Sequence, residues 1–188
     1  MALTSADIVN RAILLTGNRQ DPVTGSAPTF DDSAAGVAAR YLYPEALNTV
    51  ARQFEWDFAR RMVALTETAN TPPFEWQYEY LYPTNGIEVW QIRPLTYAAN
   101  NPAPVNYLIG NTLVSAVQTK VIWTNVEDAW AIYNNNPGPD LWDAGFTDAV
   151  VRFLASGFAM ALAGRPETAS NLLGSADSMG DAAKLRSG

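Results

Sequence analysis

The sequence predicts an α+β fold that is mainly α. In it, N- and C-terminal helices form a bundle, and a small antiparallel β module is inserted at about residues 74–125. Apolar residues recur at helical spacing towards both ends of the chain. FEWQYEY (74–80) instead alternates aromatic and polar residues, the period of a strand with one buried face. Because each terminal helix has one apolar face, we expect the helices to pack together. The 188 residues then form a single domain, with a helical part at 1–65 and 126–188 and a β insertion at 66–125.

Two helices are expected before the β module. The first covers residues 4–17 and is capped by the hydroxyl of Thr4. The second is opened by Asp31, Asp32 and Ser33, since carboxylates favour a helix N-terminus, and runs to about Phe58. Pro44 is expected to kink or restart this helix, because proline lacks the backbone donor and clashes with the preceding turn.

The β module is expected to contain four or five strands. In the first strand the rings should pack inside the module, while Glu75, Gln77 and Glu79 form a wet, acidic face. The dipeptide Gly110-Asn111 is expected to be the turn of a two-residue hairpin. The expected strands are 74–80, 87–94 and 120–125, with the hairpin at 107–115.

Helices are expected again after the β module. Residues 126–134 should form a short helix, and residues 141–163 a long apolar one. Pro166 suits the first turn of a last helix that extends to about residue 185. The apolar stretch at 153–164 is too short to span a bilayer, so no membrane association is expected. No signal peptide is expected either, because the first residues lack a basic region.

The composition excludes several kinds of chemistry. The chain has no Cys and no His, which excludes disulfides, thiolate or histidine metal sites and Ser-His-Asp triads. A net charge of −7 without a basic stripe argues against a nucleic-acid binder. Glu75 and Glu79 fit a solvent-facing strand better than a glycosidase pair, and the carboxamides around Asn135 lack the ligand spacing of a calcium loop. We therefore predict no catalytic residue, no cofactor and no metal, and we do not expect an enzyme.

Several short motifs occur in an order that is similar to one protein family. They are Tyr43-Pro44, FEWDFARRMVAL (54–65), FEWQYEYLYP (74–83), VIWTNVEDAWAIY (121–133) and the apolar segment 141–164. In this order and spacing the chain resembles the head-to-tail adaptor proteins of tailed bacteriophages, the group that includes the tail tubular protein A of short-tailed phages. The resemblance covers nearly the whole chain.

The resemblance implies a structural virion protein. About twelve copies would form a ring beneath the portal protein, extend the DNA channel and provide the attachment platform for the next tail component, a nozzle or tail tube protein. Genomic DNA would pass through the acidic lumen without sequence-specific binding. The protein would be located in the neck or tail of the virion after assembly in the host cytoplasm.

We assign three groups of residues to this role as hypotheses. For contact with the portal they are Lys184, Leu185 and Arg186. For contact between subunits they are Tyr97, Asn100 and Asn101. For packing of the core and the β module they are Trp56, Phe58, Phe74, Trp76, Tyr78 and Tyr80.

Two alternatives remain open at this point. One is another neck or tail completion protein, such as a stopper, which shares the ring but has different neighbours. The other is a glycan-binding or glycan-cleaving tail protein, which would use the Trp- and Tyr-rich strand and Glu75 or Glu79. Loss of activity on cell-wall polysaccharide in Glu75→Gln or Glu79→Gln variants would support the second alternative.

Overall fold

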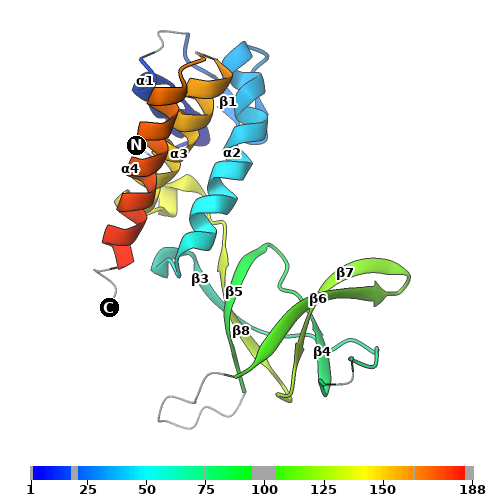
Figure 1. Ribbon diagram of the computed structural model, residues 1–188. Helices are drawn as coiled ribbons and strands as arrows, with labels where there is room; N and C mark the ends of the chain where they lie inside the picture. The colour runs from blue at the N-terminus through cyan, green and yellow to red at the C-terminus, as the bar shows by residue number, and fades with distance from the viewer. Residues whose placement is uncertain (1, 18–20, 74, 95–104, 163, 185–188) are drawn as a thin grey trace. The chain divides into compact units, whose positions relative to one another are not determined.

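The computed structural model describes residues 2–17, 21–73, 75–94, 105–162 and 164–184. The chain divides into two compact units (Figure 1). The helical unit comprises Met1–Phe54 and Pro137–Gly188, and the β unit comprises Glu55–Asn136.

The expectation of a mainly α fold with a small β module is wrong. Helices make up 42% of the structure, and strands in three sheets make up 27%, so the fold is α+β with a substantial sheet content. Two segments assigned to the helical part of the chain account for much of the difference. Residues 60–64 and 130–135 are strands, paired with each other in an antiparallel ladder. Short apolar runs are compatible with either structure, and here pairing with a distant strand decides.

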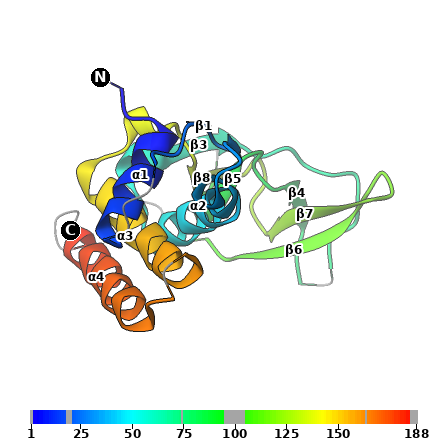
Figure 2. The same ribbon diagram turned by 90° about the horizontal axis from the view of Figure 1, so that it is seen from above.

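The helical unit is built around α3 (Ala144–Ala161). This helix contacts α1 (Ser5–Leu15), α2 (Ala34–Gln53) and α4 (Pro166–Lys184), as the view along the bundle shows (Figure 2). The side chains of α3 that face these helices are almost all buried and apolar. A two-stranded hairpin, β1 (Gly25–Ser26) with β2 (Thr29–Phe30), and a 3₁₀ turn at Pro139–Leu141 (η2) complete the unit.

The helix termini follow local capping chemistry. Thr4 caps α1 as expected, and Asp7 completes a capping box. Ser33, one of the three residues expected to open α2, is its N-cap, and the helix ends at Gln53 and not at Phe58. Pro44 lies inside α2 and does not restart it.

The described residues of the β unit form two three-stranded antiparallel sheets. Its strands and its 3₁₀ turn are η1 (Asp57–Ala59), β3 (Arg60–Ala64), β4 (Tyr78–Leu81), β5 (Gly86–Arg93), β6 (Tyr107–Val114), β7 (Val117–Thr124) and β8 (Trp130–Asn135). One sheet has the order β3-β8-β5 and the other β4-β7-β6. The chain after β3 links the sheets, since Leu81 donates its N–H to the carbonyl of Thr66 (2.8 Å) and Thr68 donates to that of Glu79 (2.8 Å).

The two sheets share one core. Its buried members come from β4, β5, β7, β8 and the turn before β8, and partly buried tyrosines surround them. The core residues are Tyr80, Val89, Ile92, Ile122, Ala129 and Ala131. The β unit thus has a hydrophobic interior of its own.

The expected hairpin turn at Gly110 is wrong. β6 runs through Gly110, and the turn lies at Ser115-Ala116, whose φ angles are 50° and 65°. Gly110 instead lies under the indole of Trp123, where an added Cβ would be 2.3 Å from the ring atom Cη2. Glycine is therefore needed at this position for close packing against Trp123 within a strand, and not for a turn.

Candidate interaction surface

The aromatic residues assigned to packing lie in different environments. Trp56 is buried and Phe58 is partly buried, with ring centroids 6.2 Å apart. The rings of Tyr78 and Tyr80 are stacked at 6.2 Å, and Tyr80 is in the core. Trp76 is partly buried, and Phe74 lies outside the described residues.

The expectation that the first strand has a solvent-exposed acidic face is wrong for Glu79. The strand begins at Tyr78, and Glu75 and Gln77, which precede it, are exposed. Glu79 is only 2% exposed, and three donors hold its carboxylate. Oε1 accepts hydrogen bonds from Thr68 Oγ1 (2.7 Å) and Asn70 Nδ2 (2.9 Å), and Oε2 accepts one from Trp123 Nε1 (2.7 Å).

This environment fixes the charge state of Glu79. Burial acts to raise the pKa of its carboxyl, but the hydrogen bonds from Trp123, Thr68 and Asn70 outweigh burial, so the pKa lies below its ordinary value. A carboxylate with both oxygens occupied and a lowered pKa does not suit a general acid. Its position opposite Trp123 in the β4–β7 ladder makes it a link between sheet and loop.

The hairpin formed by β6 and β7 exposes several apolar side chains. Within β7, Val121–Thr124 pair with β4 and Lys120 accepts a hydrogen bond from the N–H of Tyr82, whereas β6 pairs with β7 along its whole length, so the tip of the hairpin extends past β4 (Figure 1). Near the turn, Leu113 is 63% exposed and Val117 is 64% exposed. No charged residue occurs between Arg93 and Lys120. An exposed apolar surface without charges is typical of a protein–protein contact.

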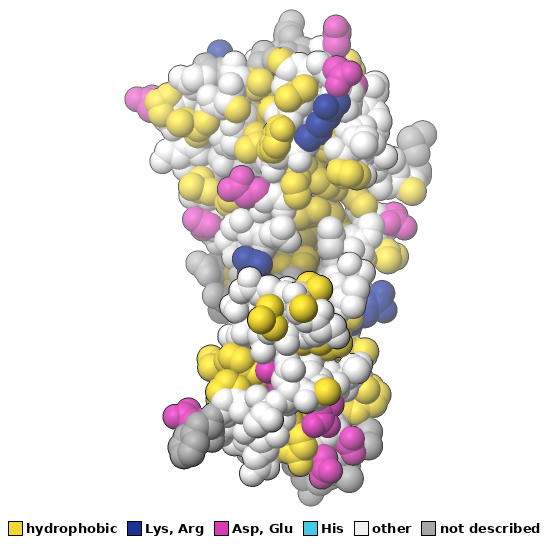
Figure 3. Space-filling view, turned by 90° about the vertical axis from the view of Figure 1, so that its right-hand side faces the viewer, with side chains coloured by type: hydrophobic (Ala, Val, Ile, Leu, Met, Phe, Trp, Pro, Cys, Tyr) yellow, Lys and Arg dark blue, Asp and Glu magenta, His cyan; other side chains and the backbone are white. Residues whose placement is uncertain are grey.

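Sequence reasoning missed this hairpin as a surface, although the sequence holds its signal. The uncharged stretch is visible by inspection in a chain with 16% charged residues. Exposed hydrophobic side chains also occur on the face drawn in Figure 3, where Lys and Arg side chains are few. In the helical unit the exposed apolar residues include Leu14 and Tyr41.

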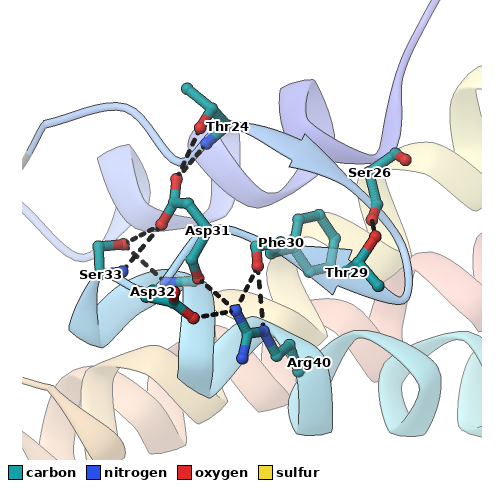
Figure 4. A network of polar contacts seen from close by, with 9 residues as sticks. Thr24, Ser26, Thr29, Phe30, Asp31, Asp32, Ser33 and Arg40 are labelled. Carbon is teal, nitrogen blue, oxygen red and sulfur yellow. Dashed lines mark hydrogen bonds and ion pairs between the residues drawn. The ribbon is translucent and has the colours of Figure 1, made fainter.

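A polar network in the helical unit surrounds Asp31 (Figure 4). One carboxylate oxygen accepts from the backbone and hydroxyl of Thr24, and the other from the backbone and hydroxyl of Ser33. Arg40 donates to the carbonyl of Phe30 (2.6 Å) and forms an ion pair with Asp32. The hydrogen bonds from Ser33 and Thr24 hold the pKa of Asp31 well below its ordinary value. The network fixes the loop that leads into α2.

The residues assigned to ring and portal contacts fall mostly beyond the described segments. Tyr97, Asn100 and Asn101 lie outside the described residues, as do Leu185 and Arg186. Lys184 is the last residue of α4.

Four further findings bear on function. Among the described residues, no cluster of acidic side chains has the arrangement of a metal site, and none of the helices is both long and apolar enough to cross a membrane. No family model matches the chain, and no curated protein matches its sequence.

Proposed function

We propose that this chain is a structural virion protein, a head-to-tail adaptor. Copies of it form a ring beneath the portal, extend the DNA channel and provide the platform on which the tail is attached. The observation that supports the proposal best is the stretch Tyr107–Thr119 of the β6–β7 hairpin, which has no charged side chain and exposes Leu108, Leu113 and Val117. A protein whose surface becomes interface on assembly needs such a region.

The hairpin has the properties of a contact between subunits. The two-residue turn and the full ladder between β6 and β7 give it a defined shape before contact. Leu113 and Val117 near its tip remove apolar area from water when a neighbouring subunit covers them. In a closed ring the contact is heterologous, so the hairpin of one copy meets a different surface on the next.

The charge of the chain suits a channel through which DNA moves. A net charge of −7 provides no excess of cations to neutralise phosphates, and phosphate contacts are the main source of non-specific DNA affinity. DNA would therefore slide past without being held. The portal contact at Lys184, Leu185 and Arg186 remains part of this proposal.

The experiment is native mass spectrometry of the purified chain mixed with the portal ring of its own phage. We expect a discrete added mass of about one chain per portal subunit, as ring symmetry requires. A Leu113→Asp, Val117→Asp double variant should lose the complete ring. Leu14→Asp is the matched control, since Leu14 is similarly exposed (71%) but lies in the helical unit. A chain that stays monomeric beside an unchanged portal would overturn the proposal.

A further inference from the structure

β3 is the least covered strand of the β unit. All five of its residues are exposed, although they point alternately to the two faces of the sheet. Met62 is 59% exposed, and the neighbouring Val63 is also exposed. β3 pairs with β8 on one side and is the edge of its sheet. An edge strand with both faces uncovered is open to pairing with another chain.

The ladder shows which backbone groups of β3 are open. Leu65 donates its N–H to the carbonyl of Ala129 (2.8 Å), in register with the β3–β8 pairs. Opposite residues in an antiparallel ladder alternate between hydrogen-bonded and non-hydrogen-bonded pairs, so Arg61 and Val63, like Leu65, direct their backbone N–H and C=O groups towards β8. The backbone N–H and C=O groups of Arg60, Met62 and Ala64 point away from β8.

The next residues of the chain confirm that alternation. Thr66 and Thr68 use their backbone groups to bond β4, on the side away from β8. β4 ends at Leu81, which is bonded to Thr66. Within the described part of the chain, no strand pairs with the outward side of residues 60–64.

The charge of this edge selects its partner. Arg60 and Arg61 are adjacent and so point to opposite faces. Arg60 forms an ion pair with Glu55 (3.3 Å), while Arg61 has no ion pair among the described residues. Basic residues on an edge strand protect it against pairing with neutral or basic strands. The two arginines attract a strand that carries carboxylates, Arg61 more strongly than Arg60, whose charge Glu55 partly balances.

We propose that β3 binds an extended acidic segment of another protein by strand addition. The segment has two adjacent acidic residues, opposite Arg61 and Arg60, and two adjacent apolar residues, opposite Val63 and Met62. In the antiparallel orientation the apolar pair precedes the acidic pair. Backbone hydrogen bonds to β3 provide affinity, and the alternating side chains provide specificity. This contact is independent of the proposed ring.

The test uses a capped peptide of sequence Thr-Val-Ile-Glu-Glu-Thr, titrated into the full chain and followed by amide chemical shifts in NMR spectra. We expect saturable shifts at Met62 and Ala64, and binding about tenfold weaker for the peptide with Lys in place of both Glu. No shift with the acidic peptide, or equal binding of both peptides, would overturn the proposal.

Met62→Pro is the decisive variant. It removes an outward N–H that the β3–β8 ladder does not use, in the place where edge strands tolerate proline, so thermal unfolding should change little. Peptide binding should disappear. Val63→Pro is the comparison, because it removes an inward N–H and should destabilise the β unit. Unchanged peptide binding by a folded Met62→Pro variant would contradict strand addition. Sedimentation showing that Met62→Pro abolishes self-association would assign β3 to a second copy instead, and would likewise overturn the proposal.

Discussion

Replacing Glu79 by Gln changes one buried carboxylate into a carboxamide of nearly the same shape. All three of its partners act as donors, namely Thr68 Oγ1, Asn70 Nδ2 and Trp123 Nε1. A carboxylate accepts all three bonds, whereas a carboxamide has one accepting oxygen and one NH₂ group. If the NH₂ faces Trp123, it meets an indole N–H, which donates only. If it faces Asn70, it meets an NH₂ that also donates to the carbonyl of Leu113.

The expected cost follows from that geometry. A hydrogen bond to a charged group contributes about 1.5–3 kcal/mol, and a buried donor left without a partner costs about 1–3 kcal/mol. The variant loses at least one such bond and weakens the others by removing the charge. We therefore expect Glu79→Gln to lower the free energy of unfolding of the β unit by about 2–4 kcal/mol at neutral pH.

The pH dependence provides a second test. The pKa of Glu79 is lowered in the folded protein, so its stabilisation is present above the unfolded pKa of about 4.5 and is lost as pH falls through the folded pKa. The stability difference between wild type and Glu79→Gln should accordingly be largest at neutral pH and shrink in acid. Other carboxyls titrate in both proteins and cancel in this difference.

Denaturant unfolding followed by tryptophan fluorescence measures the effect. Trp56, Trp76, Trp90, Trp123 and Trp130 lie in the β unit, and only Trp142 lies in the helical unit. The signal therefore reports mainly on the β unit. Glu75→Gln is the matched control, because Glu75 is exposed, and it should leave stability unchanged. If Glu79→Gln lowers the free energy of unfolding by less than about 0.5 kcal/mol, or if the stability difference from wild type persists in acid, the carboxylate does not stabilise the β unit in this way.

Three further predictions concern packing and helix termini. Gly110→Ala should destabilise the β unit by about 1–3 kcal/mol in denaturant unfolding, because the added Cβ meets Trp123. Gly174 lies in α4 with no atom within 4 Å of an added Cβ, so Gly174→Ala should be neutral or stabilising. Equal effects of the two substitutions would show that contact with Trp123 is not the cause. Asp143→Ala removes the N-cap bond to α3 (2.6 Å) and should cost about 1 kcal/mol in thermal unfolding followed by circular dichroism, whereas no loss would show that the cap is replaced. Asp31→Ala should destabilise the helical unit, by an amount that shrinks as pH falls below the ordinary pKa of 3.8, and a pH-independent effect would show that charge is not the cause.

Local chemistry made the helices predictable. Thr4 with Asp7 forms a capping box that is readable three residues apart, and Pro166 begins α4 as its position in a first turn suggests. Gly164, just before it, has a φ of 56°, a conformation that favours glycine after a helix. These features depend on neighbours within one turn, so the sequence contains them directly.

The β unit was less predictable because its structure depends on distant partners. The segment that ends in β8 looked helical in isolation, but pairing with both β3 and β5 makes it the central strand of its sheet. Gly110 looked like a turn residue, and only Trp123, on the neighbouring strand, explains it. Glu79 looked solvent-facing by alternation, and Thr68 and Asn70, which follow β3, bury it. Non-local pairing of this kind overrides local pattern.

We propose above that copies of this chain form a ring on a portal. Electron microscopy of portal rings incubated with the purified chain tests it most directly. We expect side views with an added layer coaxial with the portal, and loss of that layer with the Leu113→Asp, Val117→Asp variant. Portal rings without an added layer, in a mixture where the chain is folded and in excess, would contradict it.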